Sequence, residues 1–541
     1  MSEQDPIGHE LRQLATLIGR LERGEITRTE FRTHSAHLGL CPQRQPDLYF
    51  IRLRPSLGAL TVAQLHALAD AAENWGAGEC HLTTRQGIEL HQLSIRDALK
   101  ALKALGAAGL SSRENGGNTV RSIVVCPHPS AEANGFDVTE YAALLQEHLL
   151  RHSDFQALPR KLKIGFSCCA EDCTHTVLQD LGFQARLHVG GERGFRVMAG
   201  GGAGASPRLG SELIAFLPAN DLLIFCEAFL HAFNRLGNRE NPRRARIKFL
   251  LESLGVEKLR HEIEKERQAL AAKNWAWPIV KPPTKANQEA AAGGVLRAPV
   301  RGGIVASGQL RALAAIVGKH HLALRTTTEQ DFMLRNVRPD SAKAVQAALQ
   351  EAKLGADSPH VFVTACLGST VCSRAFTNSQ AVAQEIAREL AKLECDKSRR
   401  LPRVRVSGCS NGCALHAIAE IGLEGVAQKR EGGVIPAYRL WIGGRSHQRK
   451  PRLALDLGIV PARRVPACLS EMISLFQRER RDAETVAETV DRIGVETFAA
   501  VARWHQRGGN LRELSVDWGE HTAYRLRVET AEVPAAAHGP R

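Results

Sequence analysis

An internal repeat constrains the fold of this chain more than any other feature of its sequence. The first copy is a strand at 48–54, a helix that Thr61 can cap and that runs to Trp75, strands at 80–84 and 87–93, and a helix at 95–105. The second copy is a strand at 296–300, a glycine turn at 302–303, a helix at 308–317, and strands at 322–328 and 332–337. Because strands and helices of one order occur twice, the pattern predicts two similar α+β units.

The repeat continues beyond these units. Residues 120–126 resemble residues 361–366, and residues 162–169 resemble residues 404–409. We therefore interpret the chain as a gene duplication whose halves each hold two units. The halves are joined by a polar stretch around Pro282 and Pro283, which has the composition of a linker.

Four cysteines in the second half have the spacing of a metal centre. They form a C-x5-C pair, Cys366 and Cys372, and a C-x3-C pair, Cys409 and Cys413. Four thiolates suit a tetrahedral Zn²⁺ or an iron–sulfur cluster, and spacing alone does not choose between them. The wide gaps and the glycine-bearing segment at 407–413 favour a cubane cluster.

The first half retains only part of this cysteine pattern. Cys126, Cys169 and Cys173 match three of the four thiols, but no cysteine lies six residues after Cys126. We interpret the three as the relic of an ancestral site, so the sequence predicts one cluster, in the second half.

Composition excludes several classes of protein. With 541 residues, 44% of them hydrophobic, the chain is long enough for several packed units. It has no signal-peptide pattern at its start, and charged residues interrupt its most apolar stretch at 213–233, so we expect a cytoplasmic protein without a membrane role. The net charge of +14 comes without a run of five basic residues, which favours an acidic protein partner or bound anions over nucleic acid.

Several motifs together resemble those of the sulfite and nitrite reductase haemoproteins, which carry sirohaem next to a [4Fe–4S] cluster. The resemblance covers residues 45–480. It rests on Thr83-Thr84-Arg85-Gln86, Arg121 in a strand, Pro159-Arg160-Lys161-Leu162-Lys163, Gly200-Gly201-Gly202, and the four-cysteine signature. It implies an α+β, pseudo-twofold duplicated nitrite/sulfite reductase fold, with two ferredoxin-like half-domains and two sirohaem-binding α/β domains.

The resemblance divides the chain into six parts. They are an N-terminal helical lead-in (1–45), ferredoxin-like half-domain 1 (46–115), sirohaem-binding-type α/β domain 1 with the substrate cations (116–280), ferredoxin-like half-domain 2 (290–355), the [4Fe–4S]/sirohaem domain 2 (356–480) and a C-terminal extension (481–541).

The resemblance also implies roles for individual residues. Cys366, Cys372, Cys409 and Cys413 would ligate the cluster, and Cys413 would also bridge to the sirohaem iron. The substrate cations would be Arg52, Arg121, Lys161 and Lys163, while Thr84, Arg85, His91, Arg160 and Asn411 would lie near or on the sirohaem. Glu89 stands where relatives carry a glutamine, and we expect no role for it. A cross-link between Tyr49 and Cys126, known in some relatives, is a further hypothesis.

The segment Lys161-Leu162-Lys163 bears on the substrate. Sulfite-reducing members carry Lys-x-Lys here, whereas ferredoxin-type nitrite reductases commonly carry Asn at the second position. The sequence therefore favours six-electron reduction of sulfite to sulfide, with electrons from an acidic donor such as ferredoxin or a flavoprotein reductase subunit. The alternatives are nitrite reduction to ammonia, precorrin-3B synthase activity, and a zinc-stabilised nucleic-acid-binding protein.

Overall fold

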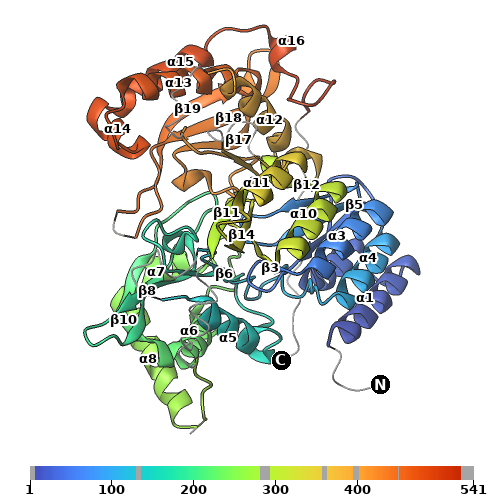
Figure 1. The fold of residues 1–541 in the computed structure, drawn as a ribbon, viewed down its shortest axis with the longest axis vertical. Coiled ribbons are helices and arrows are strands. Elements are labelled where there is room, and N and C mark those ends of the chain that lie inside the picture. The colour runs from blue at the N-terminus through green and yellow to red at the C-terminus, as the bar shows by residue number, and fades with distance from the viewer. Residues whose placement is uncertain are drawn as a thin grey trace.

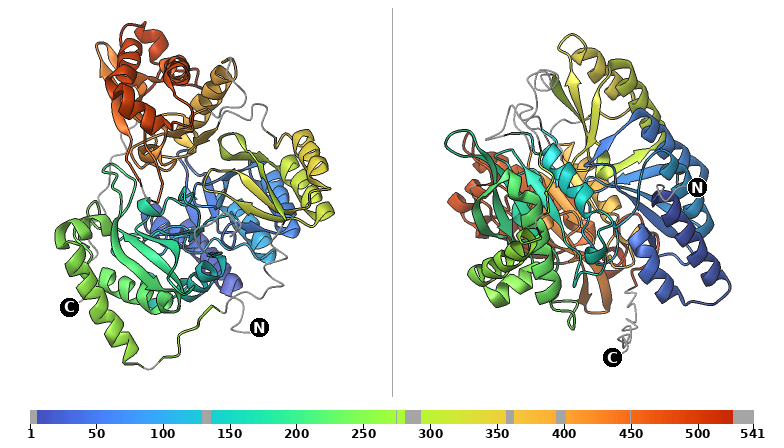
Figure 2. Two further views of the ribbon diagram at one scale, coloured as in Figure 1. Left: turned by 60° about the vertical axis from the view of Figure 1, so that its left-hand side comes forward. Right: turned by 90° about the horizontal axis from the view of Figure 1, so that it is seen from below.

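The computed structural model describes residues 6–128, 136–273, 275–280, 293–355, 362–393, 401–448 and 450–525. These form three lobes, each around its own hydrophobic core (Figure 1). One lobe joins the two ferredoxin-like half-domains, residues 6–113 and 293–355, and lies on the right in both Figure 1 and the left view of Figure 2. We call it the joint lobe, and the other two the first lobe (116–280) and the second lobe (362–525).

The first half-domain follows the predicted order of elements. Its parts are α1 (Pro6–Glu22), α2 (Arg28–Ser35), β1 (Leu40–Pro42), β2 (Tyr49–Leu53), β3 (Ala59–Leu60), α3 (Val62–Trp75), β4 (Glu79–Leu82), β5 (Ile88–Leu93) and α4 (Ile95–Ala107). Thr61 starts α3 as expected, because its side chain accepts a hydrogen bond from the Gln64 amide and Gln64 bonds back to the Thr61 amide.

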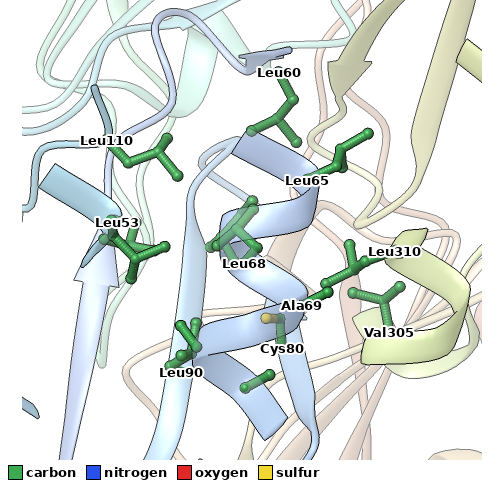
Figure 3. Close-up of a cluster of buried hydrophobic side chains, with 14 of the residues drawn as sticks. Leu53, Leu60, Leu65, Leu68, Ala69, Cys80, Leu90, Leu110, Val305 and Leu310 are labelled. Atoms are coloured by element: carbon green, nitrogen blue, oxygen red, sulfur yellow. The ribbon is translucent and has the colours of Figure 1, made fainter. Parts of the chain in front are cut away.

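The second half-domain repeats this order. Its parts are β11 (Gly294–Ala298), β12 (Ile304–Ala306), α10 (Ser307–His320), β13 (Ala323–Thr326), β14 (Phe332–Val337) and α11 (Ala342–Glu351). The α3 and α10 helices pack against each other, so the two half-domains share a single core. Figure 3 shows Val305 and Leu310 of the second copy beside Ala69 and Cys80 of the first.

The half-domains exchange a strand. β12 pairs with β4 and extends the sheet β1-β2-β5-β4-β12, while β3 pairs with β13 and extends the sheet β11-β14-β13-β3. Each exchanged strand follows a glycine in the left-handed region, Gly58 or Gly303. A Cβ on Gly58 would lie 2.9 Å from the Thr326 carbonyl oxygen, and one on Gly303 would lie 2.8 Å from that of Leu82, so the crossings require glycine.

Two buried glutamines stabilise the exchanged strands through equivalent hydrogen bonds. Gln86 donates to the Thr326 carbonyl (2.9 Å) and accepts from the Val125 amide (2.8 Å). Gln330 donates to the Leu82 carbonyl (2.8 Å) and accepts from the Ala365 amide (2.9 Å). Each amide therefore ties a strand of the opposite half-domain to the first strand of one outer lobe.

The first and second lobes contain equivalent sheets. The first lobe has β6 (Val124–Val125), β7 (Ile164–Ser167), β8 (Leu181–Leu187), β9 (Arg193–Ala199) and β10 (Ser211–Pro218), with helices α5 (Thr139–Leu149), α6 (Leu222–Leu236), α7 (Ile247–Leu254) and α8 (Val256–Ala271). The second has β15 (Val363–Ala365), β16 (Val404–Ser407), β17 (Ile421–Arg430), β18 (Gly433–Ile442) and β19 (Leu455–Pro461), with α12 (Ser379–Leu390), α13 (Val465–Glu479), α14 (Val486–Ile493), α15 (Val495–Gln506) and α16 (Leu511–Leu514). In each sheet the first three strands are parallel and the last two antiparallel.

Residues 481–525 belong to the second lobe. α14 and α15 place Val486, Val490 and Phe498 in its core, beside α13 and β19. The stretch around Pro282 and Pro283 lies outside the described residues. Within the described part of the chain, no helix combines the length and the apolar character that crossing a membrane requires.

Substitution of the two glutamines tests their role in the strand exchange. In Gln86→Leu the buried Val125 amide loses its acceptor, and in Gln330→Leu the Ala365 amide does, at a cost of about 1–3 kcal/mol per unsatisfied group. We expect faster hydrogen exchange at Val125 in the first variant and at Ala365 in the second, measured by mass spectrometry. Gln13→Leu on the exposed face of α1 is the control; protection equal to wild type at both amides would contradict the role.

Candidate active site

Four thiols gather at one edge of the second lobe's sheet. Cys366 follows β15, and Cys409 and Cys413 follow β16, so the carboxyl ends of two parallel strands bring them together. The Gly408 amide donates to the Cys366 sulfur (3.1 Å), and the Ser379 hydroxyl lies 3.3 Å from it. Burial and the nearby Cys413 raise the pKa of Cys366 to about 11, so its thiolate needs a cation beside it.

The loop that carries Cys372 is held by the joint lobe. The Arg44 amide donates to the Val371 carbonyl (2.8 Å), and its guanidinium donates to the Ala375 carbonyl (3.1 Å). The Gln45 side chain donates to the Thr370 carbonyl (2.7 Å). The thiol loops are therefore fixed by residues more than three hundred positions away in the chain.

Cys413 is the exposed member of the four thiols, and it faces the first half. The hydroxyl of Thr84 donates to its carbonyl (2.8 Å). Gly412 has a φ of +64°, and a Cβ there would lie 3.1 Å from that of Ala203 and 3.5 Å from the Gly204 nitrogen. The glycine run at 200–204 thus lies against the cysteine loop, while Asn411 beside it is exposed.

Lys161 and Lys163 present two ammonium groups near Cys413. Leu162 between them is fully buried and hydrogen-bonds through its backbone to Thr119 and Arg121, so alternation puts both lysines on the other face. Burial, Arg121 and Arg246 lower the pKa of Lys161 to about 7; burial and Arg85 lower the pKa of Lys163 well below its usual value. Among the described residues, neither ammonium has a hydrogen-bond or ion-pair partner.

Two arginines converge on one peptide carbonyl. Arg52 and Arg121 both donate to the Asn115 carbonyl, Arg52 at 2.9 Å, and Arg121 also donates to the Gly117 carbonyl (2.7 Å). Burial and Arg52 lower the pKa of Arg121. Within the described residues the partners of the Arg121 guanidinium are peptide carbonyls and not carboxylates, so this arginine is available to an anion.

Arg85 and Arg160 complete the cations. Arg85 donates to the Gln179 side chain (2.9 Å) and to the Ser122 carbonyl. Its guanidinium therefore connects the segments that precede β6 and β8. Burial, Arg374 and Arg246 lower the pKa of Arg160, whose side chain is half-buried. Arg246 itself is neutralised by a bidentate ion pair with Asp180 (2.8 Å).

Glu89, for which the sequence suggested no role, is the counter-ion of Arg52. The carboxylate accepts from the Arg52 Nε (2.5 Å) and lies 3.4 Å from His81 Nδ1 and 3.7 Å from His91 Nε2. Its side chain is 4% exposed, and although burial opposes ionisation, Arg52 and the two imidazoles hold its pKa well below the usual value. The available signal was a pair of ionisable residues, Glu89 and His91, on strand β5 between the apolar Ile88, Leu90 and Leu93.

His91 lies beside Glu89, and Tyr49 lies in a different core from Cys126. The ring of His91 contacts His81, Phe50 and Glu89, which puts it behind Arg52. Tyr49 packs edge-on against Phe31 in the core of the joint lobe. Cys126 lies instead in the core of the first lobe, where its sulfur is 3.3 Å from that of Cys173.

The pseudo-twofold axis generates a second version of this site. Thr328 donates to the Cys173 carbonyl (2.6 Å) as Thr84 does to that of Cys413. Glu329 takes the place of Arg85, and it pairs with Arg405 at 2.5 Å. A cavity of about 430 Å³ lies there, lined in part by Arg297, Arg403, Arg445, Glu171 and Glu420. Four arginines and three glutamates line this cavity, so most of its positive charge is compensated, whereas Lys161 and Lys163 have no carboxylate partner among the described residues.

Both cofactors implied by the sequence fit the residues at the first site. Four thiols with amide and hydroxyl donors are a donor set for an iron–sulfur cluster. The unpaired ammoniums of Lys161 and Lys163 suit a group rich in carboxylates, since burying carboxylates without cations is costly. Gly412 leaves the backbone beside Cys413 bare of a side chain.

Two family models cover most of the chain. The nitrite and sulphite reductase 4Fe-4S domain matches residues 116–269 and 358–507, and the nitrite/sulfite reductase ferredoxin-like half domain matches residues 42–108 and 287–352. Each model matches twice, in agreement with the duplication seen in the sheets.

Curated relatives carry both substrate names. The chain is 28% identical over 517 residues to the assimilatory ferredoxin-dependent nitrite reductase of Haloferax mediterranei, covering 88% of this chain and 87% of that protein. It is 29% identical to the chloroplastic ferredoxin–nitrite reductase of Zea mays, covering 86% of each chain. It is 26% identical to sulfite reductase [ferredoxin] 2 of Mycolicibacterium paratuberculosis, covering 73% of each.

A solved structure has the same fold. The NirA protein of Mycobacterium tuberculosis superimposes with a TM-score of 0.76 at 22% identity, covering 92% of this chain and 98% of that one. With the two family models and the four-cysteine loops, this places the chain in the nitrite and sulfite reductase family, oxidoreductases whose cofactors are sirohaem and a [4Fe–4S] cluster.

Proposed function

We propose that this protein reduces sulfite to sulfide by six one-electron transfers. The observation that carries the proposal is the pair of unpaired ammonium groups, Lys161 and Lys163, on one face beside Cys413. Two adjacent cations match a dianion such as sulfite better than the singly charged nitrite. Membership of an oxidoreductase family argues against the alternative of a zinc-stabilised nucleic-acid-binding protein.

The second half would hold the cluster and the first half most of the sirohaem. Cys366, Cys372, Cys409 and Cys413 are the proposed cluster ligands. Thr84, which donates to the Cys413 carbonyl, Asn411 in the cysteine loop, and Arg85 and Arg160 of the first half are proposed to contact the sirohaem. His91 would act indirectly, through Glu89 and Arg52. When bound, the cofactors would pass electrons from the donor to the substrate and would provide the site at which it is reduced.

The chain's own cations orient the substrate and supply protons. Arg52 and Arg121, fixed by the Asn115 carbonyl and Glu89, can each donate parallel hydrogen bonds to an oxyanion. Lys161, with a pKa of about 7, can exchange protons near neutral pH as oxygen leaves as water. Glu89 is a positioning residue, because it acts on the substrate through Arg52.

An acidic ferredoxin is the proposed electron donor. The chain carries a net charge of +14, and charge complementarity speeds encounters between redox partners. The relatives from Haloferax mediterranei and Zea mays are named as ferredoxin-dependent enzymes.

Nitrite reduction is the second candidate, because two of the three relatives above are named nitrite reductases. Steady-state turnover with a reduced viologen separates the two substrates. For the anaerobically purified protein with its cofactors we expect a higher kcat/KM for sulfite than for nitrite, with sulfide as the product. Faster nitrite turnover would overturn the assignment.

Lys163 should set the preference between the two anions. Lys163→Asn removes one of the two charges, and a charge-assisted hydrogen bond is worth about 1.5–3 kcal/mol, or roughly tenfold or more in kcat/KM. We expect that loss for sulfite and a smaller one for nitrite, measured in parallel assays. Lys265→Asn on the surface of α8 is the matched control; equal losses for both anions would argue against this role.

The lowered pKa of Lys161 predicts a pH dependence. A bound anion favours the ammonium form and raises this pKa above its free value of about 7, so binding takes up a proton. Affinity is then fully present below pH 7 and falls as pH rises through and above it. The apparent KM for nitrite, which stays a monoanion in this range, should rise with pH in wild type. Lys161→Arg should flatten the profile, because arginine remains charged; an unchanged slope would contradict the assignment to Lys161.

A further inference from the structure

A second group of thiols lies at the equivalent edge of the first lobe's sheet. Cys126 follows β6, and Cys169 and Cys173 follow β7, the parallel neighbour of β6. Their three sulfur atoms all lie within 4.8 Å of one another, and those of Cys126 and Cys173 are 3.3 Å apart. Cys168 also contacts Cys126 but lies outside this compact group.

The spacing of the sulfurs suits a single ion. Zn–S bonds of about 2.3 Å in a tetrahedral site keep the sulfurs roughly 3.8 Å apart. In the described chain, the four thiols of the second lobe form no group of three as compact as this one. A cubane cluster stands between its ligands and separates them, so the two lobes present thiols at spacings suited to different centres.

The three-thiol loop is held from the second half of the chain. Gln448 donates to the Cys169 carbonyl (2.7 Å), and Thr328 donates to that of Cys173 (2.6 Å). Within the loop, the Cys173 amide donates to the Cys169 sulfur (3.3 Å). Amide donors to sulfur and fixed carbonyls are the surroundings that orient thiolate ligands.

A half-buried arginine next to the thiols has a nitrogen without a hydrogen bond. Arg325 on β13 interacts electrostatically with Asp137 and Cys126, and its buried Nη1 has no hydrogen bond within the described residues. Three thiolates around Zn²⁺ carry a net charge of −1, which this guanidinium would balance.

We propose that Cys126, Cys169 and Cys173 bind one Zn²⁺ ion. Cys173 lines the cavity of about 430 Å³, so the fourth tetrahedral position faces that cavity and takes a water molecule from it. Binding releases the thiol protons, and the ion joins the ends of β6 and β7 at the interface with the second half.

The same location is unsuited to a second cluster and sirohaem. The sequence from Pro129 to Gly135, where the fourth cluster ligand would stand, contains no cysteine. Glu329 pairs with Arg405 in the cavity, and Glu171 and Glu420 line it as well, so an anionic cofactor would meet carboxylates there. A single ion requires neither a fourth cysteine nor a positively charged cavity.

Metal analysis and zinc K-edge X-ray absorption test the proposal on the anaerobically purified protein with its cofactors. After incubation with Zn²⁺ and removal of excess, wild type should hold one zinc per chain, with three sulfurs at about 2.3 Å. Cys173→Ala and Cys126→Ala should lose this zinc while retaining the iron content of wild type. Cys226→Ala, which removes another buried thiol from the same lobe, should keep it.

Other outcomes would overturn the proposal. They are wild type without stoichiometric zinc, zinc retained in Cys173→Ala, or a Cys126–Cys173 disulfide in wild type found by mass spectrometry under non-reducing conditions. Cys409→Ala keeps this test separate from the proposed function, because it should lower the iron content and leave the zinc in place.

Discussion

Each half-domain completes its sheet with a strand from the other half, and the position of every site residue depends on this exchange. Gln86 and Gln330 fix the outer lobes relative to the exchanged strands, because each side-chain amide also bonds to the first strand of an outer lobe. The Thr83–Gln86 turn then reaches Cys413 through Thr84, and the lysines of the first lobe face the cysteine loop of the second. The proposed active site is thus an interface between the halves and does not belong to either one alone.

A duplicated chain contains two such interfaces, and charge distinguishes them. At the first, Arg85 adds a cation to a place where Lys161 and Lys163 already lack partners. At the second, Glu329 stands at the equivalent position and pairs with Arg405. Reversal of charge at this one position compensates Arg405, in keeping with the rule that buried charges persist only when they are compensated.

The sequence allowed prediction of features that depend on local patterns or spacing. The half-domain elements and the cap at Thr61 follow from periodicity and capping chemistry, and the duplication follows from the repeat. The strand exchange could not be predicted, because it depends on pairing between residues more than two hundred positions apart. For the same reason Glu89 was assigned no role: its partner Arg52 lies on a neighbouring strand, and only the paired sheet brings the two together.

The exchanged strand also has a consequence for synthesis of the chain. β4 leaves the ribosome more than two hundred residues before β12, the strand that completes its sheet. Until then its edge presents unpaired amides and carbonyls, and Val305 and Leu310 have not yet covered Ala69 and Cys80. The first half-domain therefore stays incomplete and prone to association while the first lobe is synthesised. Correct folding then depends on keeping the open edge of β4 free of other chains.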